Sequence, residues 1–333
     1  MTQFQHRLWH AVSSGDIKRV NALARKKNVN FFFMMDDYPT YLLNVAVQRN
    51  NYAMVELLLA RGADPRNGPS PLLTAMRRNV SIVVVEKLLQ YGADPNFLIK
   101  RCLNHEEESL LYEFCKYPYR FFKDVGKLLL EHGADPFFDR NDYKTCLYVA
   151  AQNGNVVAVD VLIDHAKRNG YLTDLLAQEK RDTRTSPLLK ACTNQHVRIV
   201  EILLENGANV NAQNVYGMFP LYAATFCNNM VLVKLLLRYD VYLPLINTQT
   251  TLTAVDVAFD YGYYEVAILL EHMLDLYERA HNGQLSILKR LIFSEAAQTF
   301  PMVWIKALSP EKKRELFEWL LLHDAGGTLI PLL

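Results

Sequence analysis

The sequence contains no uninterrupted apolar run of about 18 residues, the length that a membrane-spanning helix needs. It has 36 Lys and Arg against 35 Asp and Glu, which gives a formal net charge of +1. This balance lacks the basic excess that is typical of nucleic-acid-binding proteins. Residues 1–12 also lack the apolar core of a signal peptide. We therefore expect neither a membrane span nor a nucleic-acid partner.

Paired cysteines are also absent. The chain has five cysteines, an odd number, at scattered single positions: Cys102, Cys115, Cys146, Cys192 and Cys227. Disulfide frameworks require paired cysteines and an oxidising compartment. The pattern therefore predicts free thiols and a cytoplasmic location, which includes a host cytosol if the chain is a delivered effector.

Motifs of catalysis are missing as well. The sequence has no His-Glu-x-x-His, no Cys-x-x-Cys and no glycine-rich phosphate loop. Residues 104–106 (Asn-His-Glu) and His132 are isolated. Cys115 and His132 are residue types that can act as a nucleophile and a base, but a lone Cys and a lone His indicate little without evidence that they lie close together. We expect a protein that is not an enzyme, with no catalytic residue, metal site or cofactor.

One sequence motif, by contrast, occurs several times. A leucine run, a glycine and a small residue recur at 57–65, 88–95, 128–136 and 203–211. Their glycines are Gly62, Gly92, Gly133 and Gly207, at steps of 30, 41 and 74 residues. Glycine adopts the left-handed conformation that ends a helix, and an Asp-Pro pair prevents the helix from resuming. The recurrence indicates an internal repeat of one helical unit.

The other half of the unit is a helix that begins at a capped proline and contains small residues. Pro71, Pro187 and Pro220 suit a first helical turn, where a missing N–H costs nothing. Gly154 and Gly262, or Asn50, Asn79 and Asn228, follow this helix. The order of these features recurs at 70–96, 145–166, 186–212, 219–240 and 253–272, with weaker copies at 8–24, 41–62, 109–133 and 275–292.

This pattern resembles the ankyrin repeat, in about nine units. The resemblance implies an all-α ankyrin-repeat solenoid of stacked helix-turn-helix units with short β-turn fingers. We predict an array over residues 1–298, with insertions near 97–109 and 167–184, followed by a helical C-terminal cap over 299–333.

Three segments depart from the repeat. Residues 31–35 are apolar and lie in a connection, so they are either core beneath the first repeats or an exposed finger. The segment 97–109 predicts a long finger whose glutamates, at 106–108, form a solvated face. The segment 167–184 is expected to lengthen a second helix and its return loop.

The tail predicts one more helix. Ser309 and Pro310 are typical of a helix start, and an apolar face follows within 304–327. We interpret it as a cap on the stack. The alternative is similarity to the F-box or SOCS-box helices that end some ankyrin proteins, which would make the chain a substrate adapter that recruits a ubiquitin-ligase component.

The predicted function is a non-catalytic protein-protein interaction scaffold. The resemblance places binding on a concave face formed by the finger tips and the first helices. Its positions are the two residues between an Ala pair and the following Gly, and the residues just before the Thr-Pro that begins a repeat. The corresponding residues here are Gln48, Arg49, Arg77, Arg78, Lys144, Gln152, Asn153, Thr193, Asn194, Tyr216, Met218, Phe226 and Tyr261. The early positions are basic and the late ones aromatic, which predicts a protein or peptide partner with an acidic part and an apolar anchor. Met218 and Phe226 have an alternative role as partly buried contacts between repeats.

Overall fold

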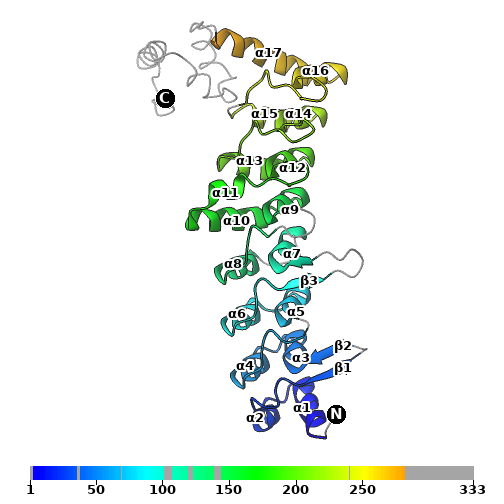
Figure 1. Cartoon of the computed structure of the whole chain (residues 1–333), viewed down its shortest axis with the longest axis vertical. Helices are drawn as coiled ribbons and strands as arrows, with labels where there is room; N and C mark the ends of the chain where they lie inside the picture. The colour runs from blue at the N-terminus through cyan, green and yellow to red at the C-terminus, as the bar shows by residue number, and fades with distance from the viewer. Residues whose placement is uncertain are drawn as a thin grey trace. The chain divides into compact units, whose positions relative to one another are not determined.

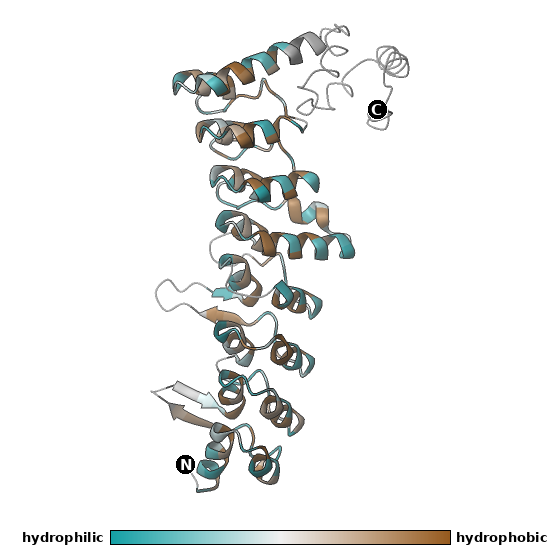
Figure 2. Cartoon of the chain, turned by 180° about the vertical axis from the view of Figure 1, so that it is seen from behind, coloured by the Kyte–Doolittle hydropathy of each residue, from teal (hydrophilic) through white to brown (hydrophobic). Residues whose placement is uncertain are grey.

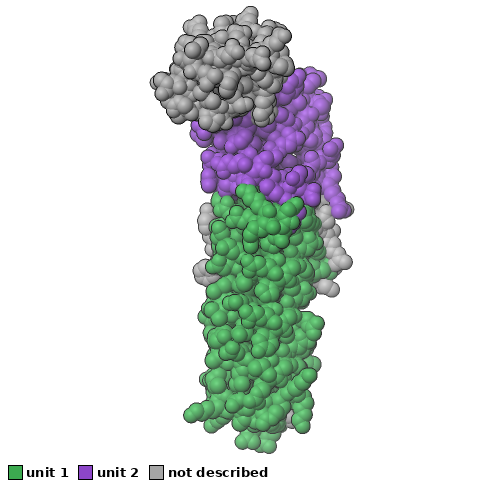
Figure 3. Space-filling model, turned by 90° about the vertical axis from the view of Figure 1, so that its left-hand side faces the viewer, with its two compact units in different colours: residues 1–170 green, residues 171–333 purple. Residues whose placement is uncertain are grey.

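The protein folds as a series of helix pairs joined by short turns. A computed structural model describes residues 3–35, 38–68, 70–100, 107–118, 123–138, 144–239 and 241–281. The chain divides into two units, residues 1–170 and residues 171–333 (Figure 3). The predicted, mostly helical repeat architecture is confirmed in each unit. None of the described helices is long and apolar enough to cross a membrane.

The first unit contains five helix pairs in its described residues (Figure 1). The pairs are α1 (Gln3–Ser14) with α2 (Ile17–Leu23), α3 (Leu42–Gln48) with α4 (Tyr52–Ala60), α5 (Pro71–Arg78) with α6 (Ile82–Gln90), α7 (Leu110–Lys116) with α8 (Lys123–Glu131), and α9 (Cys146–Asn153) with α10 (Val156–Asn169). First helices pack on first helices, as α3 does on α5, and second helices pack on second helices, as α4 does on α6. The core therefore lies between repeats as well as within them.

The second unit repeats this plan. Its described elements are α11 (Leu172–Leu176), α12 (Pro187–Thr193) with α13 (Val197–Glu205), α14 (Pro220–Phe226) with α15 (Met230–Leu236), and α16 (Ala254–Asp260) with α17 (Tyr264–His281). The first helices α12, α14 and α16 contact one another in turn. Figure 2 shows hydrophobic and hydrophilic residues alternating along the helices of both units, as expected for helices buried on one side.

Local chemistry explains where the first helices begin and end. The hydroxyls of Ser70 and Ser186 accept hydrogen bonds from the backbone three residues on, and a proline follows each cap. Asn79 ends α5 in the left-handed region at φ 52°. Asn50 and Asn228 have positive φ as well, as predicted, and Gln195 does so without having been predicted.

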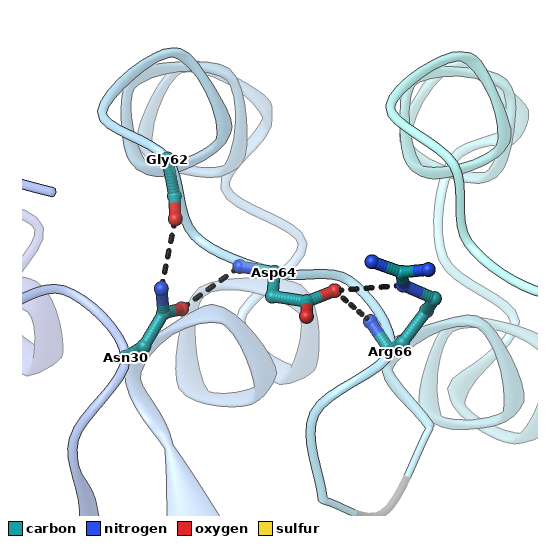
Figure 4. Close-up of polar contacts among 4 residues, drawn as sticks. All are labelled: Asn30, Gly62, Asp64 and Arg66. Atoms are coloured by element: carbon teal, nitrogen blue, oxygen red, sulfur yellow. Dashed lines mark hydrogen bonds and ion pairs between the residues drawn. The ribbon is translucent and has the colours of Figure 1, made fainter.

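Asparagine side chains connect the loops of successive repeats. Asn30 donates from Nδ2 to the Gly62 carbonyl and accepts from the Asp64 N–H, both at 2.8 Å (Figure 4). Asn96 makes the same pair of bonds, each 2.8 Å long, to the equivalent residues of a later repeat. The bridge ties each helix end to the preceding loop.

We expect Asn30→Ala to lower the free energy of unfolding by about 1–3 kcal/mol. The substitution leaves the Gly62 carbonyl and the Asp64 N–H without this partner, and each lost bond is worth about 0.5–1.5 kcal/mol. Urea titration followed by circular dichroism measures the change. Arg66→Ala is the control, because Arg66 is exposed and bonds only to Asp64 in this loop (Figure 4). An equal effect of both substitutions would contradict a role for the bridge.

The first finger is a hairpin whose side chains alternate between core and solvent. Strand β1 (Phe32–Met35) pairs antiparallel with β2 (Tyr38–Tyr41). Phe33 is buried and its ring meets that of Trp9 at 5.9 Å, whereas Phe32 and Met34 are exposed. The two interpretations of residues 31–35 therefore apply to alternate residues, because successive side chains of a strand point to opposite faces.

The second finger corrects one expectation. Strand β3 (Leu98–Lys100) pairs antiparallel with β4 (Glu107–Ser109) at the base of the predicted finger, whose residues 101–106 lie outside the described residues. Its glutamates do not form a uniformly solvated face, because Glu108 is buried and its carboxylate lies 2.5 Å from the Lys116 ammonium. A buried carboxylate of this kind needs a paired charge.

Two further differences from the regular repeat lie at the ends of helices. Helix α10 has 14 residues where α13 has 9, and α11 is an additional short helix within the segment 167–184. Helix α17 runs without a break through residues 272–275, where we expected a new repeat to begin. The boundary at 298/299 and the tail segment 304–327 lie outside the described residues, so the cap and the ligase dock stay predictions.

Candidate partner-binding surfaces

The basic candidates of the first unit lie at the ends of two neighbouring first helices. Gln48 and Arg49 end α3, Arg77 and Arg78 end α5, and all four are exposed. Helices α3 and α5 pack against each other. The first unit therefore carries an exposed, arginine-bearing edge, whose role in binding stays a prediction.

Arg77 has an additional role that the sequence did not reveal. Its Nε lies 3.7 Å from Oε1 of Glu113, and the two side chains are 44% and 2% exposed. Glu113 belongs to α7, so the ion pair joins two repeats. Arg77 thus compensates a buried carboxylate, whereas Arg49 and Arg78 are exposed charges of this edge.

Helix α7 also replaces a small residue with Phe114. A Cβ added at Gly126 in α8 would lie 2.5 Å from Cε1 of the Phe114 ring. Glycine at 126 therefore makes room for the phenyl ring, which explains how a degenerate repeat keeps the stacked geometry.

The middle candidates are more enclosed than expected of binding residues. Lys144, Gln152 and Asn153 are half-buried in the first unit. Asn194 is half-buried in the second unit, and Thr193, although exposed, donates its hydroxyl to the Leu189 carbonyl at 2.9 Å. These residues offer fewer unobstructed side chains than the arginine edge.

The aromatic candidates of the second unit lie on the surface. Tyr216, Phe226 and Tyr261 are 51%, 45% and 54% exposed, and Met218 is half-buried. The rings of Phe226 and Tyr261 meet edge to face at 5.3 Å. The alternative role as a partly buried contact between repeats therefore fits Met218. Phe226, by contrast, is exposed to solvent. Exposed aromatic side chains that already contact one another are typical interface residues.

Sequence reasoning missed Tyr263, which stacks on Tyr261 at 5.8 Å and 21°. It directly follows Gly262, outside the two positions before the glycine that the repeat pattern nominated. The aromatic content of residues 259–264 was the available signal.

Cys115 and His132 have ordinary structural roles. Cys115 is fully buried, and burial raises the pKa of its thiol well above the usual value, as does the neighbouring Cys146. Such a thiol is a poor nucleophile at neutral pH. His132 directly follows α8, and its Nδ1 lies 2.9 Å from the Leu128 carbonyl of that helix.

Comparison with known proteins gives one consistent answer. A family model described as ankyrin repeats (3 copies) matches residues 8–99 and 119–214. The chain is 24% identical over 217 residues to the human transient receptor potential cation channel subfamily A member 1, a match over 61% of this chain and 18% of the channel subunit. It is 32% identical over 143 residues to a putative ankyrin repeat protein of Rickettsia bellii, covering 41% of this chain and 46% of that protein.

Among solved structures, the ankyrin repeat domain of Bcl-3 is similar. The TM-score is 0.52 at 24% identity, over 65% of this chain and 92% of that domain. At this identity the likeness concerns the fold. The chain spans less than half the length of either sequence relative.

Proposed function

The chain belongs to the ankyrin repeat family, and on this premise we propose that it binds a protein or peptide partner through the exposed ends of its first helices and the adjoining fingers. Ankyrin repeats are protein-protein interaction domains and are generally non-catalytic. The observation that carries the proposal is the exposed contact of Phe226 with Tyr261 at the ends of two successive first helices.

Each unit carries its own candidate surface. The first-unit surface is basic, through Arg49 and Arg78, and suits an acidic segment of the partner. The second-unit surface is aromatic, through Tyr216, Phe226 and Tyr261, and suits a side chain that can be enclosed by rings. We place the protein in a reducing compartment such as the cytoplasm, and the free thiols of the four cysteines that the structure describes support this.

Site-specific photo-crosslinking tests the surface. A crosslinking amino acid at position 226 should capture the partner from the lysate of its native cell, and the same amino acid at position 231 should not. Val231 is the matched control because it is 62% exposed in the second helix α15. Capture of the same protein only from position 231 would contradict the assignment to first-helix ends.

For the captured partner, we expect Tyr216→Ala or Tyr261→Ala to speed dissociation and weaken binding by about 1–3 kcal/mol each. An exposed tyrosine that becomes buried in a complex loses its packing when truncated, which acts mainly on the dissociation rate. Biolayer interferometry measures both rates. Tyr91→Ala serves as the control, because Tyr91 is an exposed tyrosine at the end of a second helix. Unchanged dissociation in both site variants would remove them from the interface.

We expect Arg78→Glu to slow association and to weaken its dependence on salt, because an exposed charge at an interface rim mainly steers encounter. Its effect on stability should stay within about 0.5 kcal/mol, as for most surface substitutions. Association rates over a series of salt concentrations give the result. Lys18→Glu changes the charge equally at an exposed position of α2 and should leave association unchanged. Arg77→Glu is not a clean alternative, since it places a second carboxylate beside buried Glu113.

A further inference from the structure

The last described repeat has an unusual charge. Residues 239–278, between Arg238 and Arg279, contain seven Asp and Glu and no Lys or Arg. This segment includes all of α16 and most of α17. A nearly neutral chain therefore concentrates negative charge in one repeat, beside the aromatic candidates.

Three rings from successive elements form one cluster, which we call the aromatic cluster: Phe226, Tyr261 and Tyr263. Phe226 is the last residue of α14, Tyr261 caps the end of α16, and Tyr263 directly precedes α17. Tyr261 lies between the other two, at 5.3 Å from Phe226 and 5.8 Å from Tyr263. Phe226 and Tyr261 are each about half exposed. Tyr263 is half-buried, so the exposed ring area of the cluster comes mainly from Phe226 and Tyr261.

Two exposed carboxylates flank this cluster in the chain. Asp260 directly precedes Tyr261, and Glu265 follows Tyr263 by two residues. Asp256 is different, because its carboxylate accepts hydrogen bonds from the backbone N–H and hydroxyl of Thr253 at the start of α16. Asp260 and Glu265 are therefore the acids placed to meet a partner here.

We infer that the aromatic cluster, with Asp260 and Glu265, binds an arginine side chain of the partner. The face of an aromatic ring carries negative electrostatic potential and attracts a cation within about 6 Å of its centroid. The adjacent carboxylates add attraction for a cation, would repel an acidic group, and give no advantage to an apolar one. This inference rests on the proposed function and changes its apolar anchor to a cationic one.

Arginine fits this surface better than lysine for two reasons. Its planar guanidinium stacks on a tyrosine ring, and its fork of N–H donors can bond a carboxylate at the same time. The guanidinium is also less strongly hydrated than an ammonium group, so its transfer from water to the binding surface costs less desolvation free energy. The surface therefore selects a guanidinium within an extended basic segment.

The test uses the full chain and three fluorescent peptides that differ only in one residue type. Each is a Gly-Ser peptide with three evenly spaced arginines, lysines or citrullines. Citrulline keeps the shape of arginine and removes its charge. Fluorescence anisotropy should show the arginine peptide binding at least about tenfold more tightly than the citrulline peptide, and several-fold more tightly than the lysine peptide. Equal binding of arginine and citrulline peptides would overturn the inference, and equal binding of arginine and lysine would overturn the guanidinium assignment.

Variants separate the cluster from general charge attraction. Tyr261→Leu and the pair Asp260→Asn with Glu265→Gln should each reduce the arginine preference to about twofold, while Tyr261→Phe, which keeps the ring face, should retain it. Tyr91→Leu, at an exposed tyrosine of the first unit, should change nothing. A preference that survives both site variants would place the cation elsewhere. Failure here with continued crosslinking from position 226 would leave the proposed function standing, whereas loss of that crosslinking would remove the function itself.

Discussion

Leu203→Ala is expected to destabilise the second unit by about 2–5 kcal/mol. Leu203 lies in α13, is 1% exposed, and packs where this helix meets its neighbours. Truncation removes buried methyl groups and leaves a cavity that the surrounding helices fill only in part. In a stack of repeats the loss acts on the interfaces to adjacent units as well.

Hydrogen exchange of the full chain, read by mass spectrometry over residues 187–236, measures this loss where it occurs. Exchange in α13 and in the contacting helix α15 should quicken together. Val231→Ala is the matched control, because Val231 is an exposed aliphatic residue of α15. A loss below about 1 kcal/mol for Leu203→Ala would contradict the observed packing.

Gly217→Ala should have a comparable effect, about 2–5 kcal/mol, and should also displace the neighbouring Tyr216. Gly217 has φ +70°, and a Cβ there would lie within 3.0 Å of the Thr248 backbone nitrogen and of oxygens of Thr248 and Asn247. The left-handed backbone costs a non-glycine residue roughly 1–2 kcal/mol, and overpacking adds roughly 1–3 kcal/mol. The close approach holds the loop before α14 against the loop before α16.

Gly207→Ala isolates the first of these costs, that of the left-handed backbone. Gly207 has φ +88° but nothing lies within 4 Å of an added Cβ. Its substitution should therefore cost only the backbone part, about 1–2 kcal/mol. Urea titrations of both variants give the difference, and binding of the partner reports whether Tyr216 has moved. Equal costs for the two glycines would show that the fingers tolerate the added methyl group.

The candidate site was predictable where it depends on position in the repeat. The pattern of Ala pair, two variable residues and glycine nominated Arg78, Phe226 and Tyr261, and all three are exposed at the ends of first helices. It could not show that Tyr263 completes the aromatic cluster or that Arg77 is held by Glu113. Both contacts depend on how far a side chain reaches between elements, which the spacing of residues does not encode.

The sequence by itself determined the repeat, its helix starts and its helix ends. The local signals are Ser70 with Pro71 and the glycines at 62, 92, 133 and 207. These residues act through their own backbone preferences and their nearest neighbours in the chain, so their roles can be predicted from the local sequence. Only the tertiary structure decided which apolar or charged residues are enclosed. Phe33 is buried while Phe32 is not, Glu108 and Glu113 are buried carboxylates paired with cations, and α17 continues past a predicted break. Burial is set by the neighbouring repeats, which supply the surrounding atoms and the compensating charge.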